Sequence, residues 1–196
     1  MTDTHTVELF ILKCAVIETE LRTNVAASPD LHVQSQLLDD DRIDPFIKQF
    51  SLENRVNASK MARYYEIFYM LENDIRRLIV ETMEEQHGAD WWDTHVSQPV
   101  KDEVRKNKSR EAQAGVTARS EAEIDYTTFG QLSDILKDNW DTFAGMLSTQ
   151  PAVMRVLWGL NMLRGTIAHC GLLADDEVDR LKLAIRDWFR VLEGPK

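Results

Sequence analysis

Apolar residues recur every three or four positions along most of this chain, the spacing that lines one face of an α-helix. The stripe of the longest predicted helix begins at Met61, continues through Phe68 and Ile75, and ends near Met83. No segment alternates apolar and polar residues as a half-buried strand does. The pattern predicts an all-α fold with six helices, near residues 4–25, 59–87, 97–112, 128–146, 150–170 and 175–192.

Residues with strong capping preferences mark the ends of several predicted helices. Thr128 and Gln131 have the spacing of a capping box. Pro151 suits the first turn of a helix, and Gly88 and Gly171 are expected as C-terminal stops. Trp91-Trp92 and residues 113–125 are predicted to lie in loops, the second of them flexible.

The apolar period is lost over residues 26–57, where Ser28-Pro29-Asp30 is a turn signal and Asp39 to Arg42 is a charged run. We therefore predict an N-terminal helix and connector at residues 1–57 and a main helical domain at residues 58–196.

Charge and cysteine content narrow the functional classes. The formal net charge is -10, which argues mildly against a nonspecific nucleic-acid binder but leaves room for a local RNA site. Cys14 and Cys170 make no disulfide framework and are interpreted as cytosolic thiols. No apolar run approaches the ~18 residues of a membrane span, so a cytoplasmic protein without a membrane partner is expected.

Generic motifs predict neither a metal site nor a cofactor. His87 and His95 flank a loop, and exposed loop histidines are favoured over metal ligands there. Trp91 and Trp92 are favoured as core residues over base-stacking residues. One basic cluster stands out in the acidic chain and is predicted to contact RNA phosphates, although a solvated helix face is the simpler interpretation: Lys101, Arg105, Lys106, Lys108 and Arg110.

The segment from Arg164 to His169 carries an Arg-x4-His motif near the end of a predicted helix and before a last helix that contains Trp188. Together with the Tyr64–Arg76 segment, this region resembles the HEPN superfamily over residues ~60–192. The resemblance implies an antiparallel helical bundle, here with an extra N-terminal helix. It also implies a homodimeric, metal-independent endoribonuclease with Arg164 and His169 as catalytic residues.

Elementary geometry agrees with a site that two chains share. Positions five apart on an α-helix differ by ~140°, so Arg164 and His169 converge only at a frayed helix end or across a twofold axis. Such a site needs no metal, because histidine can move the proton and arginine can hold the phosphate. By resemblance, Glu72, Asn73 and Arg76 are second-rank cleft candidates, although Glu72 and Arg76 also have the spacing of a surface ion pair.

Two interpretations of function remain open. An endoribonuclease in a toxin, stress or phage-defence role is favoured by the intact motif, and an antitoxin or regulatory protein is an expected partner. A non-catalytic HEPN-type dimerisation or interaction module is favoured by the acidic charge and by Gly165, where relatives carry a polar residue, often Asn. A ligand-binding helical regulator has no specific residue behind it.

Overall fold

The computed structural model describes residues 43–194, so the helix expected at residues 4–25 lies outside the described part. The chain divides into two units at Val56–Asn57, and each is considered by itself. The first unit contributes the short helix α3 (Asp44–Ile47) and the start of α4 (Leu52–His87). That residues 1–57 and residues 58–196 are separate domains stays a prediction.

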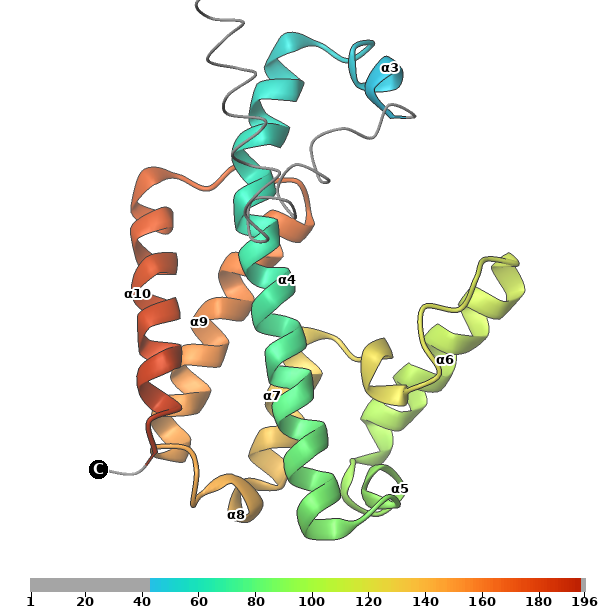
Figure 1. Ribbon diagram of the computed structural model, residues 1–196, viewed down its shortest axis with the longest axis vertical. Coiled ribbons are helices and arrows are strands. Elements are labelled where there is room, and N and C mark those ends of the chain that lie inside the picture. The colour runs from blue at the N-terminus through green and yellow to red at the C-terminus, as the bar shows by residue number, and fades with distance from the viewer. Residues whose placement is uncertain (1–42, 195–196) are drawn as a thin grey trace, which may run out of the picture. The chain divides into compact units, whose positions relative to one another are not determined.

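The second unit is all-α, as the apolar pattern predicted. After α4 come α5 (Trp91–His95), α6 (Gln98–Ala114), the 3₁₀ helix η1 (Glu123–Tyr126), α7 (Phe129–Asp138), α8 (Trp140–Phe143), α9 (Gln150–Ala168) and α10 (Asp175–Val191). Residues 43–194 contain no strand, and none of their helices is long and apolar enough to cross a membrane. Figure 1 shows α9 beside α10, with α4 passing across α7 and α9.

The apolar stripe of α4 builds the centre of the core. Phe68, Ile75, Ile79 and Met83 are buried against residues of α7, α9 and α10. Phe68 meets Phe129 of α7 edge to face, with ring centroids 6.5 Å apart, an arrangement worth ~1 kcal/mol beyond burial alone. This packing fixes the face of α4 that carries Glu72 and Arg76 towards the start of α7.

Several boundaries differ from those predicted. Helix α4 begins at Leu52 rather than near residue 59, and Trp91-Trp92 open the helix α5 rather than lying in a loop. The helix expected over residues 128–146 breaks at Asn139, whose side chain donates to the Ile135 and His95 carbonyls. A side chain that bonds the backbone in this way competes with helix continuation.

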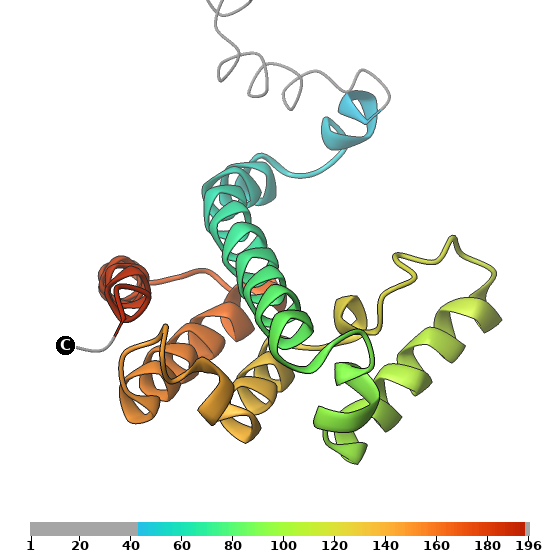
Figure 2. The same ribbon diagram turned by 60° about the horizontal axis from the view of Figure 1, so that its bottom comes forward.

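The predicted capping residues Thr128, Gln131 and Gly88 are confirmed. Thr128 and Gln131 form both hydrogen bonds of a capping box, and Gly88 has the left-handed φ of 77° expected just after α4. Figure 2, which turns the bottom of Figure 1 forward, shows α6 standing beside the loop that leads to η1. That loop and η1 occupy the region predicted as flexible over residues 113–125.

The end of α9 has a Schellman-type geometry. Gly171 N–H donates to the Thr166 carbonyl at 2.8 Å, and Cys170 N–H donates to the Ile167 carbonyl. The left-handed residue is Cys170, with a φ of 58°, rather than Gly171. Gly171 is required for another reason, because a Cβ atom there would lie 2.8 Å from the Thr166 methyl group. The turn places His169 at the C-cap of α9.

Candidate functional site

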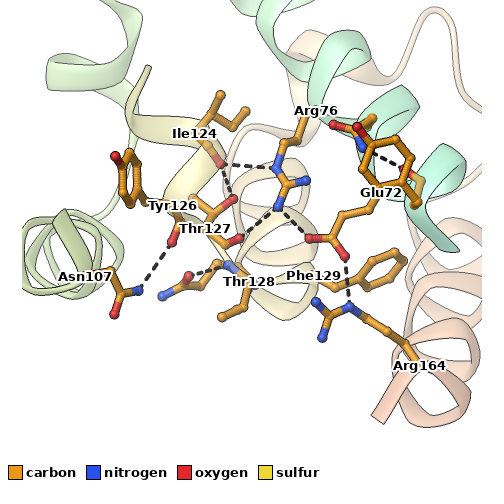
Figure 3. A network of polar contacts seen from close by, with 12 residues as sticks. Glu72, Arg76, Asn107, Ile124, Tyr126, Thr127, Thr128, Phe129 and Arg164 are labelled. Atoms are coloured by element: carbon orange, nitrogen blue, oxygen red, sulfur yellow. Dashed lines mark hydrogen bonds and ion pairs between the residues drawn. The ribbon is translucent and has the colours of Figure 1, made fainter. Parts of the chain in front are cut away.

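Glu72 lies between two arginines in the close view of Figure 3. One carboxylate oxygen accepts a 2.5 Å hydrogen bond from Arg76 Nη2, one helical turn along α4. The other accepts a 2.8 Å bond from Arg164 Nε of α9, 92 residues away in sequence. The Glu72 and Arg76 side chains are only 13% and 14% exposed, so these bonds form in a partly desolvated setting where they are stronger than on the surface.

Arg76 joins this pair to the start of α7. Its Nε donates to the Ile124 carbonyl at 3.3 Å, and its Nη2 donates to the Thr127 carbonyl at 3.0 Å. The planar guanidinium thus bonds a carboxylate and two backbone carbonyls at once, which an ammonium group could not do in the same geometry. Arg76 therefore uses its Nε and Nη2 groups to hold η1 against α4.

Arg164 makes fewer hydrogen bonds than Arg76. Its only hydrogen bond or ion pair with a described residue is the one from Nε to Glu72, and its side chain is 33% exposed. Both terminal nitrogens therefore keep their hydrogens for another acceptor, and a guanidinium with two such nitrogens matches the oxygens of a phosphate. Glu72 fixes the direction in which they point.

The network borders a cavity of about 420 Å³. Helices α4 and α9 and the segment around η1 supply its walls. Charged side chains on the lining comprise three arginines and two carboxylates, so this part of an acidic chain carries a local positive excess. The lining residues are Tyr65, Phe68, Tyr69, Glu72, Asn73, Arg76, Arg119, Asp125, Arg164, Ile167 and Ala168.

Ion pairs pin the segment that closes one side of the cavity. Arg119 bonds Glu111 and lies over the Tyr126 ring at 5.0 Å. Lys108 bonds Glu123 at 2.9 Å. The hydrogen bonds from Arg119 and Lys108 hold the pKa values of the Glu111 and Glu123 carboxyls below their ordinary range. Both pairs are therefore intact at neutral pH and are lost as the pH falls through those lowered values.

The structure brings together only some of the residues singled out in the sequence. Arg164, Glu72, Asn73 and Arg76 all line the cavity. His169 is exposed at the end of α9 and is not among the residues that line the cavity. The Asn73 amide donates to the Tyr69 carbonyl at 2.7 Å, leaving its oxygen directed elsewhere.

The predicted RNA-binding cations all lie on α6, none of them lines the cavity, and each has a polar partner. Arg105 pairs with Asp102, while Lys106 and Arg110 both approach Glu103. The partners of the other two are the Asp93 carbonyl for Lys101 and Glu123 for Lys108. Their role in RNA binding stays a prediction.

His87 and His95 are not exposed loop residues. Their rings stack at 3.8 Å between centroids, half-buried where α4 and α5 end, and His87 Nε2 lies 2.9 Å from Thr142 Oγ1. Within residues 43–194, no group of three or more His, Cys, Asp or Glu residues is arranged to hold a metal ion.

Sequence reasoning missed several lining residues. Tyr65 and Tyr69 precede Glu72 by seven and three positions, so helical spacing alone places all three on one line along α4. That spacing was the available signal. Arg119 and Asp125 carried no such signal, because Arg119 lies in the loop before η1 and Asp125 in the short η1 itself.

The second unit is an all-α domain in which charged and aromatic side chains line a cavity beside α9, the helix at whose end the Arg-x4-His motif lies. Comparison with known families agrees with this fold. Residues 66–193, more than half of the chain, match the Swt1-like HEPN family, and the chain belongs to that family. Neither the curated proteins nor the solved structures contain a match. The HEPN family generally includes ribonucleases, and HEPN domains often dimerise.

Proposed function

We propose that this protein is a metal-independent endoribonuclease that cuts RNA in a homodimer, in a toxin, stress or defence role. The observation that carries the proposal is the hydrogen bonding of the Arg164 guanidinium group. Its Nε is fixed by a largely buried carboxylate while both terminal nitrogens have no acceptor among the described residues. A permanently charged donor that is fixed in position but unsaturated suits a phosphate whose charge grows during reaction.

The chemistry uses the substrate's own nucleophile. The ribose 2′-oxygen attacks phosphorus, its proton passes to a base, and the 5′-oxygen leaves with a proton from an acid. The products are a 2′,3′-cyclic phosphate and a 5′-hydroxyl, and DNA is not cut because it lacks the 2′-OH. His169 is the proton-transferring group, since an imidazole has one ring nitrogen that can accept a proton and one that can donate it. Arg164 holds the phosphate oxygens.

A second copy of the chain is needed because His169 lies outside its own cavity. The exposed face of α9 offers a contact surface: Trp158 and Met162 are 68% and 58% exposed and lie on the same helical line as His169. Gly165 lies on this line as well, and a Cβ atom there would have no neighbour within 4 Å. Two α9 helices packed through this face bring both His169 side chains to a twofold axis.

The test is a cleavage assay on single-stranded RNA in EDTA, with the same sequence as DNA beside it. The wild-type protein is expected to cut only the RNA, and His169→Ala is expected to abolish cutting. Arg164→Ala is expected to lose nearly all activity, whereas Arg155→Ala, an exposed α9 arginine, serves as the matched control. Circular dichroism checks that each variant is folded. Cleavage that survives His169→Ala unchanged would refute the proposal.

The dimer has its own measurement. Light scattering at micromolar concentration is expected to give twice the chain mass of 22.6 kDa. Trp158→Glu is expected to shift the protein to a monomer and to remove cleavage with it, because a charge at a packed apolar contact is unfavourable. A monomeric wild-type protein that still cuts RNA would contradict the shared site.

The second candidate is a non-catalytic HEPN interaction module. The exposed Trp158 and Met162 favour it, because the same apolar surface serves a protein partner without any chemistry. Gly165→Asn separates the two candidates, because among the described residues no atom beyond the adjoining α9 backbone lies within 4 Å of a Cβ at this position. An enzyme limited by the missing polar group gains activity, whereas an interaction module gains none.

A further inference from the structure

Tyr65 and Tyr69 place two exposed aromatic rings at the cavity. Their exposed fractions are 63% and 61%, although both residues line the cavity. The rings are one helical turn apart on α4, with centroids separated by 6.5 Å and planes inclined by 36°. Large parts of both rings therefore stay open to solvent, and core packing does not account for them.

Helical spacing aligns the two rings with the ionic network. Tyr65, Tyr69, Glu72 and Arg76 follow each other at intervals of four, three and four residues, so they form one line along α4. At ~1.5 Å per residue, Tyr69 is about 4.5 Å from Glu72 along the helix axis and Tyr65 about 10 Å. The aromatic part of the cavity thus adjoins the carboxylate that holds Arg164.

This juxtaposition fits a nucleotide better than a bare anion. Arg164 offers two nitrogens to a phosphate, and the neighbouring tyrosines offer flat apolar faces to a base. The Asn73 oxygen, left over after the amide bonds the Tyr69 carbonyl, adds an acceptor for a base edge. Stacking on aromatic rings tolerates any base, because every base has a π-face.

We propose that Tyr65 and Tyr69 form a stacking platform for an unpaired base of single-stranded RNA, with an adjacent phosphate at Arg164. The proposal rests on the proposed function and specifies how its substrate is held. It assigns to these two tyrosines the role considered for Trp91 and Trp92. Trp91 is 5% exposed and meets Trp92 edge to face, and Trp92 packs against the core, so neither offers a comparably open face.

The experiment measures binding separately from cleavage. The probe is a labelled 2′-O-methyl RNA of about 12 nucleotides, which cannot be cut because its 2′-oxygen is blocked. Fluorescence anisotropy compares wild type with Tyr65→Leu, Tyr69→Leu and Tyr69→Phe. Phe189→Leu, an equally exposed aromatic on α10, is the control. A second probe of equal length carries abasic sugars throughout.

On the base-containing probe, each Tyr→Leu change is expected to weaken binding about tenfold, equivalent to ~1.4 kcal/mol. Tyr69→Phe and Phe189→Leu are expected to change it less than twofold. On the abasic probe, wild type and all variants are expected to bind equally. Unchanged binding of the Tyr→Leu variants, equal losses on both probes, or a wild type that binds neither probe would overturn the platform.

Cleavage of unmodified RNA by the same preparations separates this proposal from the proposed function. Binding that depends on the tyrosines but is not followed by cleavage supports the platform and contradicts the proposed nuclease activity. Cleavage together with binding that does not depend on the two tyrosines supports the nuclease and overturns the platform. If the Tyr→Leu variants instead turn a dimer into a monomer by light scattering, the rings are a partner contact and the platform is overturned.

Discussion

Glu72 on α4 and Glu103 on α6 each have a cation about one helical turn away on the same helix, but their surroundings differ. Glu72 is 13% exposed and also bonds Arg164 from α9. Glu103 is 40% exposed, and its partners Lys106 and Arg110 both belong to α6. The first carboxylate joins three parts of the fold through Arg76 and Arg164, whereas the second makes pairs that solvent screens.

The comparison separates two kinds of charged cluster that look alike in the sequence. A desolvated carboxylate between two arginines is costly to remove, because the remaining charges lose their partner. An exposed pair contributes little to stability, and its cation can exchange one anion for another at small cost. The first arrangement suits a site that must keep its geometry, and the second suits a surface that meets phosphates transiently.

The largest effect is expected from Glu72→Ala. This change leaves Arg76 and Arg164 without their shared carboxylate, and we expect the free energy of unfolding to fall by about 3 kcal/mol. Glu103→Ala, the matched change on α6, is expected to cost less than about 0.5 kcal/mol. Urea denaturation followed by circular dichroism measures both. Equal losses at the two positions would remove the distinction between buried and exposed clusters.

A smaller effect is expected from Arg76→Lys, which keeps the charge but loses the planar donor group. At least one of the bonds to the Ile124 and Thr127 carbonyls is lost, so we expect a cost of about 1–2 kcal/mol. Limited trypsin digestion should also cut faster after Arg119, because η1 is held less firmly. Arg77→Lys is the neighbouring control, since the bond that Arg77 makes within residues 43–194 is to Asp74 on the exposed side of α4. Identical digestion of the two variants would contradict the role given to Arg76.

Local signals predicted the helices because apolar period and capping residues act within a few positions. The capping box at Thr128 and Gln131 is such a signal, and the structure contains it. The break at Asn139 could not be predicted in the same way, because its side chain bonds the His95 carbonyl, 44 residues away. The early start of α4 was missed because residues 52–58 carry little apolar period, although they are helical.

The candidate site was predictable in part for the same reason. Spacing identified Glu72 and Arg76 as an ion pair one turn apart, and the Arg-x4-His motif identified Arg164. Their meeting across 92 residues depends on how α4 packs against α9, which no local pattern encodes. The meeting of two His169 side chains stays a prediction, since it depends on a second chain.

The smallest effect is expected from replacing exposed cations of α6, and it tests the predicted RNA contacts there. The double change Arg105→Gln and Lys106→Gln removes two cations whose ion pairs are exposed and local. Stability should change by less than about 0.5 kcal/mol, because such pairs contribute little. RNA affinity should fall about two- to threefold at low salt and be unchanged at high salt, since counterion release drives phosphate contacts. Each phosphate contact that is lost should reduce the slope of log affinity against log salt by about 0.7.

The matched control is Arg180→Gln with Lys182→Gln on α10, which removes the same charges from exposed pairs with Asp176 and Asp179. If both double variants lose affinity equally, the effect is one of total charge, because RNA would then respond to the -10 chain as a whole rather than to α6. If the α6 variant alone loses affinity, exposed ion pairs on α6 exchange their carboxylates for phosphates while the Glu72 network stays intact. If neither variant loses affinity, α6 is a solvated helix face, and the cavity with Arg164 holds the RNA without it.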